Sequence, residues 1–183
     1  IVAGNATPAV NIQDPPNGAF FDWGDFIHYQ VTVFDLEDGG TTNQAILPSN
    51  VTIQPFLGHG DHPHPQSIQG GLQGLFPAPE LTGSDSDDLY LLVEASYTDR
   101  GAPGTVPLTG RTTHTLHPKR KQAEHFKLRS GVTALPTLDP AGGGLDIVDI
   151  DHGDYLVLSP ANLLNITSIV CRVASNFGGR IKV

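Results

Sequence analysis

The stretch that decides the fold is His28-Tyr29-Gln30-Val31-Thr32-Val33-Phe34. Tyr29, Val31 and Val33 alternate with mostly polar residues, and successive side chains of a β-strand point to opposite faces. This period of two is typical of a strand with one buried and one exposed face. An acidic turn with two adjacent glycines follows at residues 35–40, where the strand would end. The stretch therefore predicts a half-buried β-strand.

Further strands are predicted along the chain. The alternation returns in residues 51–56, where Pro55 indicates an edge strand or a strand end because proline lacks an amide donor. Residues 89–97 are the strongest candidate for a buried strand, and residues 111–116 predict a Thr-rich strand. Residues 58–88 are rich in Gly, Pro, His, Ser and Asp, and we interpret them as a long polar loop.

Composition supports an all-β fold class. Glycine and proline account for 21 and 15 of the 183 residues and are spread along the whole chain. Both residues interrupt helices, so long helices are not expected. The apolar fraction of 38% is enough for a core, and short strands separated by turn residues indicate β-sandwiches.

Charge and hydropathy exclude two classes of partner. Nineteen acidic against ten basic residues give a net charge of −9, which repels a nucleic-acid backbone. No run approaches the roughly 20 apolar residues that span a bilayer, so no membrane span is expected. The single cysteine, Cys171, excludes an intrachain disulfide, and its apolar neighbours Ile169 and Val170 predict a buried side chain.

The chain is predicted to contain two domains. An extended leader at residues 1–16 opens a first domain that ends near Pro118, before the basic run Lys119-Arg120-Lys121. The predicted domains are residues 1–118 and 119–183, and the second contains strand-like runs at 145–150, 155–158 and 166–174.

Two segments of the first domain, Gly18–Asp25 and Val31–Gly39, resemble immunoglobulin-like domains of the PKD type. The resemblance implies an immunoglobulin-like β-sandwich for residues 1–118. Domains of this type accompany secreted enzymes that act on sugars, so the resemblance also implies an extracellular setting.

Four motifs after residue 118 resemble a family 6 carbohydrate-binding module. They occur in the family's order, as Gln122–Phe126, Gly142–Gly144, Ile150–Tyr155 and Arg172–Ile181. The resemblance implies a β-jelly roll of the galactose-binding-like type, which binds polysaccharides without cleaving them. Modules of this family continue beyond the Gly-Gly-Arg-Ile strand, so we expect an incomplete jelly roll with an exposed edge at Arg180–Val183.

The same resemblance implies two sites. Gln122 and Glu124 match positions that help to hold a structural Ca²⁺ ion, and oxygen donors at i and i+2 of one strand face the same side. Asp149, His152 and Tyr155 fall at the sugar-binding cleft, but Asp149 stands where the family usually has a tyrosine. A hydrated carboxylate cannot stack on a sugar ring, so weak or absent sugar binding through this cleft is predicted.

A histidine cluster forms a separate candidate metal site. In an extended backbone His62 and His64 point the same way, and His59 or Asp61 could complete a site for zinc or copper. The alternative is a packed or solvated loop without an ion. The acidic residues 85–88 are interpreted as a solvated turn, because they lack the glycine and terminal glutamate of an EF-hand.

Three Asn-x-Ser/Thr triplets begin at Asn5, Asn50 and Asn165, and these are candidate N-glycosylation sites. Such triplets fit an extracellular chain. Attached glycans therefore join polysaccharide among the expected partners.

The sequence leaves three functions open. The first is a non-catalytic extracellular module that binds or associates with glycans. The second is a structural subunit of a self-assembling filament, in which the leader Ile1–Ile12 pairs with the edge at Arg180–Val183 of the next copy. The third is a metal-dependent enzyme that uses the loop histidines. No nucleophile elbow, P-loop or zinc-protease motif occurs, so we expect no enzyme activity, and Ca²⁺ is the candidate cofactor.

Overall fold

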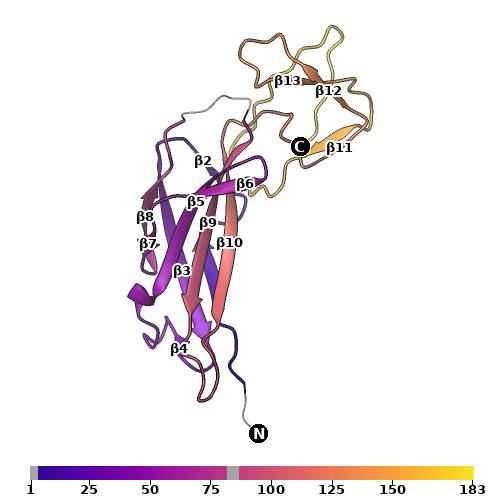
Figure 1. The fold of residues 1–183 in the computed structure, drawn as a ribbon. Helices are drawn as coiled ribbons and strands as arrows, with labels where there is room; N and C mark the ends of the chain where they lie inside the picture. The colour runs from indigo at the N-terminus through magenta and orange to yellow at the C-terminus, as the bar shows by residue number, and fades with distance from the viewer. Residues whose placement is uncertain (1–3, 82–86) are drawn as a thin grey trace.

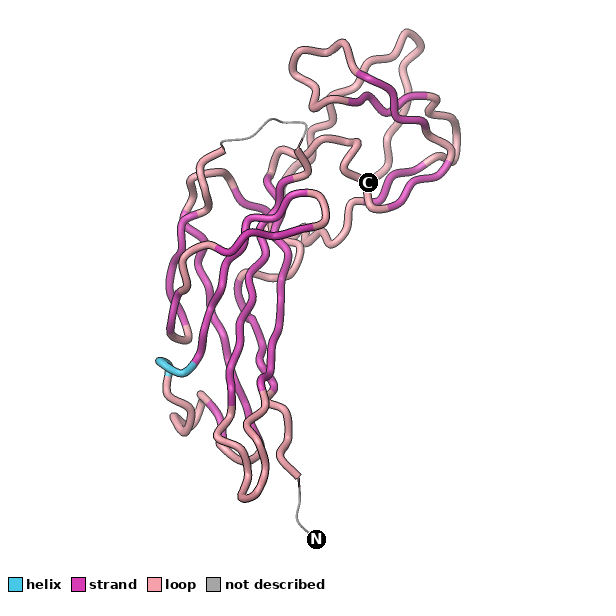
Figure 2. The backbone as a smooth tube through the Cα atoms, viewed as in Figure 1, coloured by secondary structure: helices cyan, strands magenta, loops and turns pink. Residues whose placement is uncertain are grey.

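A computed structural model describes residues 4–81 and 87–183, and it contains several β-sheets (Figures 1 and 2). In these described ranges there is no α-helix, and the one helical turn is the three-residue 3₁₀ helix η1 (Pro48–Asn50). No helix among them has the length and apolar character needed to cross a bilayer. The predicted all-β class is confirmed.

A four-stranded antiparallel sheet is built around β3 (Phe26–Asp35). Its other strands are β1 (Ala9–Asp14), β4 (Gly39–Gly40) and β8 (Gln73–Pro77). Each of these three strands pairs with β3 directly. The stretch 28–34 therefore occupies the centre of its sheet.

A second, six-stranded sheet is built around β5 (Val51–His59), β9 (Leu89–Thr98) and β10 (Thr109–Pro118). β9 lies between the other two and pairs with both in antiparallel register. The short strands of this sheet are β2 (Phe20–Phe21), β6 (His62–Pro65) and β7 (Gln69–Gly70).

The two sheets share one apolar core. Alternate residues of β3, namely Tyr29, Val31 and Val33, are buried together with alternate residues of β9, namely Leu91, Val93 and Ala95. Full burial of side chains of this size stabilises a fold by about 1.5–3 kcal/mol each. The predicted half-buried strand at 28–34 and buried strand at 89–97 are both confirmed.

The N-terminal leader belongs to this core. β1 pairs with β3, with Val10 opposite Val33 and Ile12 opposite Val31, and the side chains of Val10 and Ile12 are buried. The expectation that the leader is free to enter a neighbouring copy is therefore wrong. Val10 and Ile12 cover the chain's own sheet, and residues 1–3 lie outside the described residues.

Two expectations about the middle of the chain are also wrong. β5 is not an edge strand, because it pairs with β9 on one side and with β6 and β7 on the other. Proline has no amide donor, and the donor missing from Pro55 would point to the same side of β5 as its carbonyl. On that side the Pro55 carbonyl accepts a hydrogen bond from the Gln66 amide, which belongs to the connecting segment after β6, so no strand pairing is lost.

The long polar loop expected at residues 58–88 instead contains β6, β7 and β8. Of the acidic turn at 85–88, Asp85 and Ser86 lie outside the described residues, while Asp88 pairs with Lys121.

The residues after Pro118 form two separate two-stranded sheets, and in Figure 1 they lie beyond one end of the large sheets. β11 (Leu128–Ser130) pairs with β14 (Tyr155–Val157), and β12 (Thr133–Pro136) pairs with β13 (Leu145–Val148). The predicted strand at 166–174 and the edge strand at 180–183 are not formed, and Cys171 is exposed rather than buried. The jelly roll and the domain boundary near Pro118 stay predictions.

Packing of the leader on β10 gives a testable consequence. A Cβ atom on Gly110 would lie 2.0 Å from the Pro8 carbonyl oxygen, a backbone atom that cannot turn aside. We expect Gly110→Ala to lower the free energy of unfolding by about 1–3 kcal/mol in urea denaturation. Gly70→Ala is the control, because nothing lies within 4 Å of the added Cβ atom. Equal effects of the two substitutions would contradict the placement of the leader.

Stability should also depend on His117, which is buried at the end of β10. Burial and then the Lys121 charge lower the pKa of His117, against weaker opposing effects of Pro160 and Asp88. Below about pH 6.5 the unfolded state therefore binds more protons than the folded state. We expect the free energy of unfolding to fall as the pH drops below about 6.5.

Denaturant titrations between about pH 5 and pH 8 measure this dependence. His117→Gln should flatten it, whereas His152→Gln, at an exposed turn, should leave it unchanged. An unchanged pH dependence in His117→Gln would assign the effect to other groups.

Candidate functional site

The predicted histidine cluster lies on a tight hairpin between β5 and β6. β5 ends at His59, β6 begins at His62, and Gly60 and Asp61 form the turn between them. Gly60 has φ +57°, while Asp61 does not have a positive φ, which matches a two-residue turn with glycine first. The turn fixes the register that places His59 directly opposite His62.

All three histidines lie on one face of this hairpin. His62 and His64 are two residues apart on β6, and His59 is the cross-strand partner of His62, so their side chains share a face. In β5 this is the face of Val51, Ile53 and Pro55, which are buried. His59 is therefore half-buried just beyond the core, and the other two histidines are exposed.

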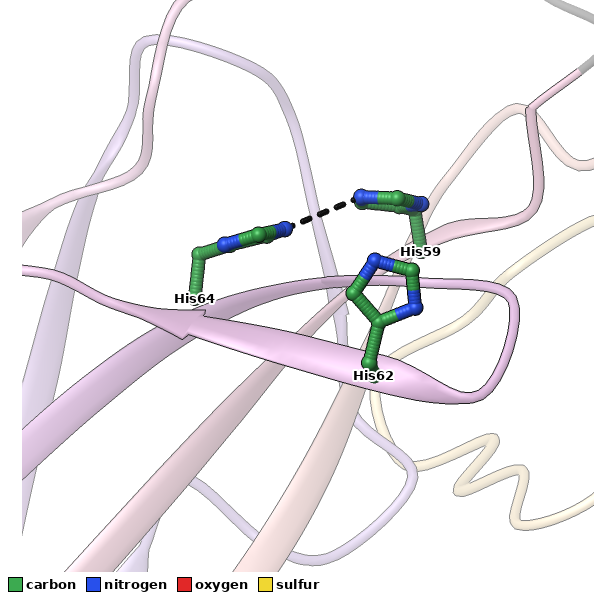
Figure 3. A group of neighbouring side chains, drawn as sticks. All are labelled: His59, His62 and His64. Atoms are coloured by element: carbon green, nitrogen blue, oxygen red, sulfur yellow. Dashed lines mark hydrogen bonds between the residues drawn. The ribbon is translucent and has the colours of Figure 1, made fainter.

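The imidazole rings are in close contact (Figure 3). The Nε2 atoms of His59 and His64 are 3.0 Å apart, and these two rings are nearly parallel. The His62 ring stands edge-on beside them, with its centroid 4.1 Å from that of His59. One nitrogen from each ring can be chosen so that all three lie within 4.8 Å of one another.

Asp61 plays a different part from the one predicted. Its Oδ1 atom lies 3.1 Å from Nδ1 of His62, so it contacts a histidine at the side of the cluster. The hydrogen bond with His62 is the main cause that lowers the pKa of the fully exposed Asp61 carboxyl group. Asp61 thus orients the His62 ring and does not itself join the cluster, in which the nitrogens of the three histidines lie close together.

A second candidate site is a groove where the two large sheets meet at their edges. Its volume is about 490 Å³, within the usual range for ligand pockets of about 300–1,000 Å³. The buried side chains of Pro55 and Phe76 line it from the two sheets. The Phe26 ring also lines it and is 70% exposed, although most aromatic rings of this size are buried.

Polar groups line the same groove. They are Gln66, Ser67, Gln69 and Glu80, and Glu80 is the one charged side chain among the described lining residues. Gln54 holds the segment that carries Gln66, Ser67 and Gln69, because its Nε2 atom donates to the Gln66 carbonyl at 2.7 Å. The Gln66 and Gln69 side chains donate to backbone carbonyls as well. Each of these two side-chain amides still has a second N–H group and an oxygen atom that can form hydrogen bonds with a ligand.

Sequence reasoning missed this groove. Its residues lie in segments 24–26, 55, 66–69 and 76–80, which come together only through the pairing of β8 with β3 and of β7 with β5. A partial signal was present in Phe26, which occupies the polar face of an alternating strand.

The predicted calcium ligands do not form the arrangement that was expected. Gln122 and Glu124 lie in a turn and not on a strand, so the argument that they face one side of a strand fails. Oε1 of Glu124 instead accepts from the Leu145 amide at 3.2 Å. Within the described ranges, His59, His62 and His64 are the one group of three His, Cys, Asp or Glu side chains close enough to share an ion.

The residues predicted for the sugar cleft are dispersed. Tyr155 is exposed on β14, His152 lies in a turn, and Asp149 follows β13 with a left-handed φ of +57°. No hydrogen bond or ring contact joins these three residues in the part of the chain that the structure describes.

The candidate glycosylation sites differ from one another. Asn50 and Asn165 are exposed, so an attached glycan would meet solvent. The Asn5 amide nitrogen, which would carry the sugar, already donates to both Asp99 carboxylate oxygens and to the Val106 carbonyl. A glycan there would break part of this network.

Comparisons with known proteins identify no relative that shares these sites. No protein-family model matches the chain, and none of the curated proteins or solved structures compared with it is a match.

Proposed function

We propose that this chain is a non-catalytic extracellular binding module whose ligand is a neutral polysaccharide, held in the groove beside Phe26. The observation that carries the proposal is an exposed aromatic ring in a groove that also contains amide, hydroxyl and carboxylate groups. A sugar ring has an apolar face of C–H groups and a rim of hydroxyl groups. Phe26 matches the first, and the side chains of Gln66, Gln69 and Glu80 match the second.

Charge narrows the ligand class to neutral sugars. None of the described residues that line the groove is cationic, and the chain has a net charge of −9. A polyanionic glycan would therefore approach a surface of its own sign. Neutral polysaccharides such as xylans, glucans or galactans are not repelled in this way.

The test compares two exposed phenylalanines of the same strand. Affinity electrophoresis in gels that contain neutral polysaccharides should retard the protein, and Phe26→Ala should weaken binding about tenfold or more, because withdrawing one aromatic ring from a contact costs about 1.5–3 kcal/mol. Phe34→Ala should bind like the unaltered chain, because Phe34 is 58% exposed on β3 but does not line the groove.

Two outcomes contradict the proposal. One is full binding by Phe26→Ala. The other is binding that disappears in Tyr155→Ala, which would place the sugar at the C-terminal segment instead. Acidic polysaccharides in parallel gels test the charge argument, and strong retardation there would overturn it.

Self-assembly is a second candidate function, and exposed apolar residues near the C-terminus favour it. Val170 and Phe177 are 92% and 100% exposed, and the strand-like segment 166–174 forms no sheet within the described residues. A neighbouring copy that pairs with this segment would cover these side chains. This assembly differs from the one first expected, because the leader is already used in the chain's own sheet.

Assembly predicts concentration-dependent sedimentation of the intact chain. Val170→Asp should shift the distribution toward the monomer, because a charge buried in an interface is costly. Val106→Asp is the control, at another apolar residue that is 72% exposed. A monomer at all concentrations, or equal effects of the two substitutions, would exclude this second function.

A further inference from the structure

We propose that His59, His62 and His64 form a binding site for one divalent transition-metal ion of the copper or zinc type. The inference is independent of the groove, because none of the three histidines lines it. It goes beyond polysaccharide binding and assigns a chemical role to the β5–β6 hairpin.

The spacing of the ring nitrogens is close to what an ion requires. Two nitrogens bound at about 2 Å to one tetrahedral ion lie about 3.3 Å apart. The His59 and His64 Nε2 atoms are 3.0 Å apart and share one hydrogen between them. An ion that replaces this hydrogen gains both lone pairs with little movement of either ring.

His62 supplies the third ligand, and Asp61 prepares it. Because Nδ1 of His62 faces the Asp61 carboxylate at 3.1 Å, the Nε2 atom is left to bind the ion. A carboxylate that accepts the other N–H of a metal-binding histidine fixes the tautomer and increases the basicity of the ligand nitrogen. The pair therefore resembles the outer support that metal-binding histidines commonly have.

The backbone holds the three rings in place before an ion arrives. Pro63 and Pro65 flank His64 and fix their own φ angles, while the Gly60-Asp61 turn fixes the cross-strand register. β5 is anchored by its pairing with β9 over its whole length. Such preorganisation reduces the entropy that is lost when the ion binds.

The ligand type selects the class of ion. Three imidazoles favour copper, zinc, nickel or cobalt over calcium and magnesium, which prefer oxygen ligands. Affinity should follow the general order in which Cu²⁺ binds more tightly than Ni²⁺ or Zn²⁺. His62 and His64 are exposed, so water can fill the remaining coordination positions.

The test titrates the intact chain with Cu²⁺ and with Zn²⁺ in isothermal calorimetry. We expect one ion per chain, and the electron paramagnetic resonance spectrum of the Cu²⁺ form should show coupling to imidazole nitrogens. His64→Asn should weaken binding by well over about tenfold, and Asp61→Asn by about tenfold. Circular dichroism should show that both variants keep the β-sheet signal, because the substitutions lie at an exposed hairpin tip.

Two controls make the assignment specific. His152→Asn removes an exposed histidine outside the cluster and should leave the affinity unchanged. Phe26→Ala should also keep the ion, whatever it does to polysaccharide binding. Unchanged affinity in His64→Asn, or an equal loss in His152→Asn, would overturn the site. So would a stoichiometry above one that persists in His64→Asn.

Discussion

Burial of one face of β3 together with one face of β9 is the constraint on which the rest of this structure depends. Because strand side chains alternate, a register slip of one residue would turn Val31 or Val93 toward solvent and expose the core. The register of β9 then sets that of β5, whose odd-numbered residues point inward as far as the end of the core. His59 continues that series, and so its ring lies on the inner face where the core stops.

Both candidate sites occur where the core ends and the sheets have edges. β6 is an edge strand, and its two prolines limit further pairing because neither can donate a backbone hydrogen bond. The groove opens between β8, another edge strand, and the segment that follows β6. Edges leave room for ligands because they lack a neighbouring strand. The same segment thus ends the histidine hairpin and begins the polar wall of the groove.

The residues after Pro118 show that a segment with a strand-like sequence does not form a strand when no other strand pairs with it. Ile166–Ala174 has the composition of a strand, but a strand is stable only when another strand satisfies its amides and another surface covers its apolar face. Within the described residues neither is present for this segment, and Val170 and Cys171 are exposed. The core residues of the large sheets all lie before this region, at or before Leu116.

Local pattern was sufficient for the sequence to determine the all-β class and the strands at 28–34, 89–97 and 111–116. The strand at 28–34 alternates so regularly that few other conformations would bury its apolar residues, and the other two strands are rich in apolar or β-branched residues. The sequence also determined that His62 and His64 share a face, since that follows from residue spacing alone, while the Gly60-Asp61 turn, a readable signal for the place of His59, was overlooked. Only the tertiary structure decided that β1 covers its own core, that Pro55 sits inside a sheet and that Gln122 and Glu124 lie in a turn. It also decided that Phe26 shares a groove with Gln66 and Glu80. The reason is that strand pairing and burial join residues far apart in the chain. The free energy of these contacts depends on partners that cannot be identified from a local sequence pattern.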